Sequence, residues 1–98
     1  MAKIEETRSY PNKSANDYFE AACRAYPKAG FELWKKREIA WLAIAKCMDE
    51  GKQIDSNASA RPGNPPVLTV NISAEHLSEE ALRPMMDKLL NALSEELK

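Results

Sequence analysis

The sequence holds few residues whose types and spacing could support chemistry. Its single histidine is His76, and its two cysteines, Cys23 and Cys47, belong to no CxxC pair. A structural zinc site needs about four sulfur or imidazole ligands, more than these three residues supply. His76 could act as a general base oriented by Glu75 or Glu79, but its polar surroundings are typical of a solvated loop. We therefore predict no metal site.

Signatures of nucleophilic catalysis and of phosphate binding are also missing. The sequence contains no GxSxG motif around a serine, which is the arrangement that exposes a nucleophile in many hydrolases. Its three glycines, Gly30, Gly51 and Gly63, lie too far apart for a glycine-rich phosphate loop. We predict no catalytic residue and no cofactor, and we favour a non-enzymatic protein.

Composition limits the kind of protein further. A chain of 98 residues, 44% hydrophobic and 30% charged, is typical of one globular domain over residues 1–98. The formal net charge of −1 argues against nucleic acid as a partner, and Glu32 and Glu38 flank the one basic run, residues 35–37. No apolar stretch is long enough to span a membrane. The first residues lack the apolar run of a signal peptide, so we expect a cytoplasmic protein.

Two segments show the apolar spacing of amphipathic helices. The first covers residues 14–26, where Ser14 and Asp17 resemble a capping box and Pro27 and Gly30 are expected to end the helix. The second covers residues 78–97 and carries an almost continuous apolar stripe. That stripe consists of Leu82, Met85, Met86, Leu89, Leu90, Leu93 and Leu97.

Other segments favour strands. Residues 3–10 alternate weakly and end at a proline, which is typical of an edge strand. Residues 67–72 are rich in β-branched side chains and place Leu68, Val70 and Ile72 on one face. Residues 53–60 alternate weakly, and the Pro- and Gly-rich stretch 61–66 must be a loop.

Residues 31–50 have two interpretations. One is a pair of strands, residues 31–38 and 39–47, and the other is a single long helix. We favour strands, because a helix here would carry apolar residues around most of its circumference. In addition, residues 49–52 can form a tight turn. A hairpin folded there places Cys47 opposite Ile54, Ala45 opposite Ser56 and Ala43 opposite Ala58, which gives a face of small side chains.

These elements follow the order β-α-β-β-β-β-α and predict a two-layer α+β sandwich. An antiparallel sheet of four to five strands would carry both helices on one face. The alternative is a mostly helical domain with one β-hairpin. The α+β order resembles a shortened helix-grip fold, and this resemblance implies a curved sheet that grips the C-terminal helix and can hold a hydrophobic ligand.

Two functions are compatible with such a domain. The one we favour is a non-enzymatic interaction module that binds a protein partner or a second copy of itself through a sheet edge or helix surface. The alternative is a small helix-grip-like carrier that holds an apolar small molecule between the sheet and the C-terminal helix. Candidate pocket residues for the carrier are aromatic or flexible, although ordinary core packing would also explain them. They are Tyr26, Trp34, Trp41, Met85 and Met86.

Overall fold

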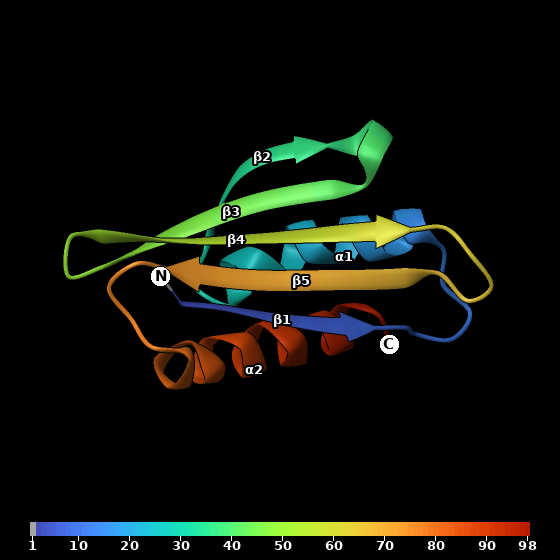
Figure 1. Ribbon diagram of the computed structural model, residues 1–98. Helices are drawn as coiled ribbons and strands as arrows, with labels where there is room; N and C mark the ends of the chain where they lie inside the picture. The colour runs from blue at the N-terminus through green and yellow to red at the C-terminus, as the bar shows by residue number, and fades with distance from the viewer. Residues whose placement is uncertain (1) are drawn as a thin grey trace.

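The computed structural model describes residues 2–98 and contains one five-stranded sheet and two α-helices (Figure 1). The elements in chain order are β1 (Ala2–Arg8), α1 (Ala15–Lys28), β2 (Glu32–Arg37), the short 3-10 helix η1 (Glu38–Ala40), β3 (Leu42–Asp49), β4 (Lys52–Arg61), β5 (Val67–Ala74) and α2 (Glu79–Glu96). All neighbouring strands are antiparallel, in the order β1-β5-β4-β3-β2. The predicted α+β order is confirmed, and the alternative of a helix over residues 31–50 is wrong.

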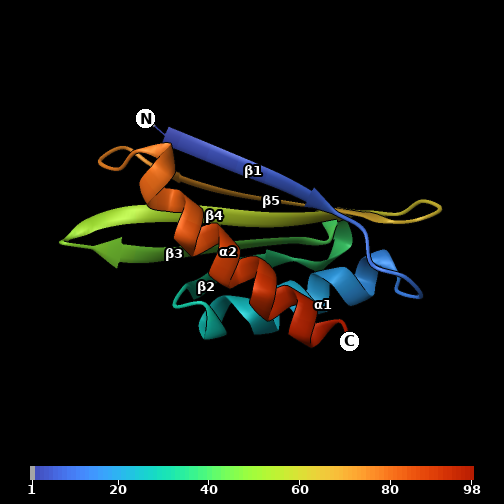
Figure 2. The same ribbon diagram turned by 90° about the horizontal axis from the view of Figure 1, so that it is seen from below.

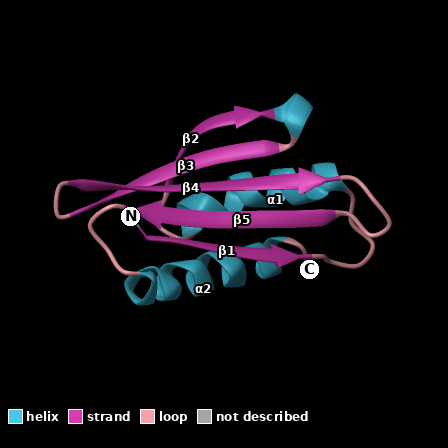
Figure 3. Ribbon diagram, viewed as in Figure 1, coloured by secondary structure: helices cyan, strands magenta, loops and turns pink. Residues whose placement is uncertain are grey.

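Both helices cover the same face of the sheet, so the molecule has two layers (Figures 2 and 3). We call this covered face the inner face and the opposite one the outer face. Strand β5 illustrates the alternation, because Leu68, Val70 and Ile72 are fully buried while the residues between them are half-buried. Helix and sheet side chains form a single hydrophobic cluster. Burial of one sheet face is the usual solution for an antiparallel sheet.

The β3–β4 hairpin has the predicted register. Cys47 pairs with Ile54, Ala45 with Ser56 and Ala43 with Ala58. The turn between the strands places Glu50 and Gly51 at positive φ, 51° and 80°, which matches the twist of a two-residue hairpin. The local sequence around Gly51 was therefore sufficient to define both the turn and the pairing.

Helix α1 begins as predicted but ends two residues later. The Ser14 side chain accepts a hydrogen bond from the backbone N–H of Asp17, whose carboxylate in turn accepts from the Ser14 N–H. Pro27 lies inside the last turn, where it removes only its own N–H from the helical ladder. The helix ends at Lys28, Gly30 follows with a φ of 89°, and the N–H of Phe31 donates to the Tyr26 carbonyl over 2.9 Å.

The reversal between β2 and β3 differs from the predicted strand over residues 39–47. Residues Glu38–Ala40 form a 3-10 turn, and Trp41 adopts the left-handed conformation with a φ of 48°. The Trp41 N–H donates to the Glu38 carbonyl, and the Trp41 carbonyl accepts from the Ala60 N–H. This long-range contact with β4 stabilises a turn that has no glycine, asparagine or proline, so β3 begins only at Leu42.

Candidate functional site

The interface between α2 and the sheet is apolar throughout its centre. Helix α2 packs against α1, β1 and β5 and contributes Leu82, Met86, Leu89 and Leu93, each at most 1% exposed. The facing row on β5 is equally buried. A side chain beside a water-sized hollow would retain accessible surface, so this interface is closed and tightly packed.

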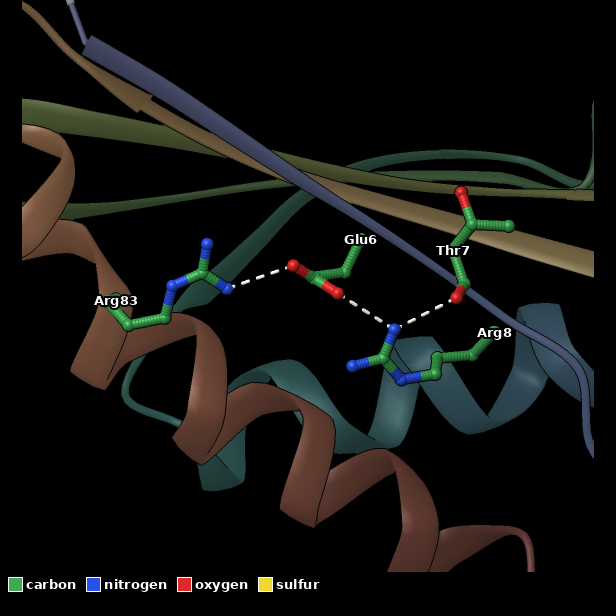
Figure 4. Close-up of polar contacts among 4 residues, drawn as sticks. All are labelled: Glu6, Thr7, Arg8 and Arg83. Carbon is green, nitrogen blue, oxygen red and sulfur yellow. Dashed lines mark hydrogen bonds and ion pairs between the residues drawn. The ribbon is translucent and has the colours of Figure 1, made fainter.

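Ion pairs at the rim attach the N-terminal half of α2 to the sheet. The Arg83 guanidinium donates to Glu6 of β1 over 2.9 Å, and Arg8 donates to the other carboxylate oxygen of Glu6 over 2.8 Å (Figure 4). Hydrogen bonds from Arg83 and then Arg8 hold the pKa of Glu6 below its ordinary value. Glu6 and Arg83 are separated by most of the chain, so no local sequence signal identified this pair.

A second set of ion pairs attaches the C-terminal end of α2 to α1. The carboxylate of Glu96 accepts hydrogen bonds from Lys28 and Arg24, and these bonds lower the pKa of Glu96, with Lys28 the larger contributor. Both cations are largely exposed. Among residues 2–98, the polar side-chain links between α2 and the rest of the molecule are therefore solvent-accessible ion pairs.

Buried hydroxyl groups hold α1 in a different manner. The Ser56 hydroxyl on β4 donates to the Asn71 carbonyl over 2.7 Å, so the phenol of Tyr26 donates to Ser56 over 2.9 Å. Burial raises the pKa of the Tyr26 phenol far above its ordinary value. Near the other end of α1, the Tyr18 hydroxyl accepts from the Tyr10 N–H and donates to the Tyr10 carbonyl.

The predicted pocket residues do not gather around one hollow. Tyr26 is fully buried on the inner face, bonded to Ser56. Trp34 is 60% exposed on the outer face, where the Lys46 ammonium lies 5.8 Å from its ring centroid. The sheet therefore separates these two rings, which the sequence prediction had placed together.

The other three predicted residues are also dispersed. Met86 is fully buried under α2, while its neighbour Met85 is half-buried at the edge of the core. Trp41 is half-buried in the turn before β3. Of the five candidates, Met86 alone lies at the centre of the α2–sheet interface.

A hollow of about 530 Å³ opens on the surface where β4 begins and β5 ends. His76 borders it and lies with its Nε2 atom 3.1 Å from the Asp49 carboxylate. The lining residues are Lys52, Gln53, Asp55, Ser73, Ala74, Glu75 and His76. Within residues 2–98, every buried side-chain nitrogen or oxygen has a hydrogen-bond partner, so no unsatisfied group points into this hollow.

Comparisons with known proteins identify the fold. No protein-family model matches the chain, and no curated protein matches it either. The chain is similar in structure to Ara h 8.0201, with a TM-score of 0.61 and 9% identity over 96% of this chain and 93% of that chain. It is also similar to the major latex-like protein 151 of Panax ginseng, with a TM-score of 0.58 and 11% identity over 98% and 95% of the two chains.

These similarities define the fold. The chain has an α+β fold like that of helix-grip proteins, with a five-stranded antiparallel sheet, a shorter N-terminal helix and a longer C-terminal helix. Identities of 9% and 11% establish the fold and no particular function. In the part of the chain that the structure describes, no helix is long and apolar enough to cross a membrane.

Proposed function

We propose that this domain is a carrier that binds an apolar small molecule between α2 and the inner face of the sheet. The observation that carries the proposal is the contrast between the apolar centre of the α2 interface and its rim, where the polar links are exposed ion pairs. An interface of this kind can exchange side-chain contacts for ligand contacts without leaving a buried polar group unpaired.

The ligand would enter when α2 moves away from the sheet. Helix α2 is joined to β5 by the short segment 75–78. When α2 opens, the charged groups of its rim ion pairs can hydrogen-bond to water instead. The hydrogen bonds of the Tyr26 and Tyr18 hydroxyls hold α1 in place. Met86 is the unbranched, adaptable side chain at the centre of the interface. The helix-grip resemblance of the fold supports the same location for a ligand.

Methionine methyl NMR tests this location with an internal control. Protein labelled at the methionine methyl groups would be titrated with laurate and with a fluorescent anilinonaphthalene sulfonate. We expect the Met86 signal to shift, because it lies under α2, while the signal of Met48, which is 62% exposed on the outer side of β3, stays in place. Shifts at Met48 with none at Met86 would identify surface adsorption and would refute the carrier.

A pair of matched variants tests whether α2 must open. Glu6→Gln weakens the attachment of α2 to β1, so opening becomes easier and the apparent affinity for laurate should rise. Glu95→Gln removes an exposed ion pair with Lys98 at the C-terminal end and leaves that attachment intact. Equal affinities of both variants and the parent protein would argue against an opening step.

A further inference from the structure

Strand β2 forms one free edge of the sheet, and exposed apolar groups gather beside it. Among residues 2–98, the large hydrophobic side chains that remain exposed are Trp34 at 60%, Ile39 at 97% and Met48 at 62%. They lie on β2, on η1 directly after it and on the adjacent strand β3. Unpaired backbone groups beside exposed apolar side chains are typical of an edge that pairs with another strand.

A β-bulge changes which face each residue of β2 occupies. The pairing with β3 shifts between Leu33 and Lys35, so Trp34 is the extra residue of the bulge. Leu33 and Lys36 pair with the buried residues Ala45 and Ala43, which places them on the inner face. The remaining residues lie on the outer face, as shown by their β3 partners or, for Trp34, by the Lys46 ammonium over its ring. They are Glu32, Trp34, Lys35 and Arg37.

The resulting pattern along β2 is outer, inner, outer, outer, inner, outer. It is the same in both directions. When two antiparallel strands are related by a two-fold axis perpendicular to the sheet, residues that face each other must lie on the same face. A regular strand of this length cannot overlap fully with its own copy, because its two ends lie on opposite faces. The bulge at Trp34 removes this conflict.

We propose that β2 pairs antiparallel with β2 of a second copy of this chain, with the two-fold axis between Trp34 and Lys35. Full overlap places Glu32 opposite Arg37 of the second copy at both ends of the pair. In the centre, Trp34 faces Lys35 of the second copy, which repeats the contact that Trp34 already makes with Lys46. The dimer would join two sheets into one continuous sheet.

Charge complementarity is the reason for choosing a second copy as the partner. The strand carries an acidic residue at its start and basic residues toward its end, so antiparallel self-pairing brings opposite charges together. On the inner face, Leu33 would meet the alkyl stem of Lys36 from the other copy. The contact covers one short strand per copy, so the dimer should be weak and should dissociate on dilution.

Sedimentation velocity over protein concentrations from about 10 μM to about 1 mM tests the proposal on the full chain. We expect the parent protein to shift from monomer to dimer. Glu32→Arg places two arginines opposite each other, and Arg37→Glu places two glutamates opposite each other, so each variant should remain monomeric over more of this range. The double variant E32R/R37E restores opposite charges and should recover the dimer.

Both side chains are exposed, so these variants should keep the fold, which circular dichroism would verify. The matched control is Lys3→Glu with Glu5→Lys on β1, the opposite edge of the sheet, which should leave dimer formation unchanged. A parent protein that stays monomeric throughout would overturn the proposal and leave β2 as an edge for a different chain. A double variant that forms no more dimer than the single variants would also overturn it.

Discussion

Helices α1 and α2 lie on the same face of one sheet but are attached to it in different ways. Helix α1 approaches strands whose inner residues are small, such as Ala45 and Ala58, and it places Tyr26 in a buried hydrogen-bond chain. Helix α2 relies on large aliphatic side chains such as Leu89, with ion pairs at its rim. Directional bonds fix α1 in one position, whereas non-directional apolar contacts allow α2 to be displaced.

This difference assigns separate roles to the two helices. Helix α1 and the β3–β4 hairpin form the fixed part of the domain, and α2 is the element whose contacts a ligand can replace. Strand β2 is the edge of the sheet opposite β1, and α2 packs at the β1 end, so the proposed dimer and the proposed ligand site do not compete.

The largest expected effect comes from truncating the centre of the α2 interface. Leu89→Ala removes a side chain that is 1% exposed, and it should lower the free energy of unfolding by about 2–5 kcal/mol. The neighbouring variant Leu90→Ala changes a half-buried side chain and should cost clearly less. Urea unfolding measures both, and equal losses would contradict the assignment of Leu89 to the centre of the interface.

A smaller effect should follow from enlarging a side chain on α1. Ala25 is fully buried, so Ala25→Leu overpacks the core around α1 and should cost about 1–3 kcal/mol. Ala92→Leu makes the same change at a half-buried position of α2 and should be better tolerated. If thermal unfolding showed that Ala25→Leu does not lower the stability, the close packing around Ala25 would be contradicted.

Removing one hydroxyl group tests the directional part of the α1 attachment. Tyr26→Phe leaves Ser56 bonded to the Asn71 carbonyl, so the cost should be that of one hydrogen bond, about 0.5–1.5 kcal/mol. Because the two hydroxyls act together, Tyr26→Phe combined with Ser56→Ala should cost less than the sum of the single changes. If the losses of unfolding free energy measured in urea simply added, the two hydroxyl groups would act independently and the predicted coupling would be contradicted.

The smallest expected effect is the response of the α2 rim to acid. The pKa values of Glu6 and Glu96 are held below 4.5, so their contribution to stability is present at neutral pH and is lost as the pH falls through their lowered values. The double variant E6Q/E96Q should therefore show a shallower loss of melting temperature between neutral pH and about pH 3. Glu95→Gln is the control. If the melting temperature of the double variant fell with pH as steeply as that of the parent protein, these ion pairs would not stabilise α2.

Local patterns predicted most of the scaffold. Helix α2, strand β5 and the turn at Gly51 were recognisable because their apolar spacing or positive-φ residue acts over a few positions. The candidate site was less predictable. Met86 was identified by the apolar stripe of α2, but the rim pair of Glu6 and Arg83 joins opposite ends of the chain, and the charges alone do not determine which acid meets which base.

The sequence by itself determined the apolar stripe of α2, and it favoured the α+β order and the small-residue face of the β3–β4 hairpin, because each depends on periodicity within one segment or on one turn. Only the tertiary structure decided that Tyr26 is buried while Trp34 faces solvent. A bulge forms between two paired strands and shifts the alternation of one of them, so the face of each β2 residue depends on β3 as well as on its own sequence.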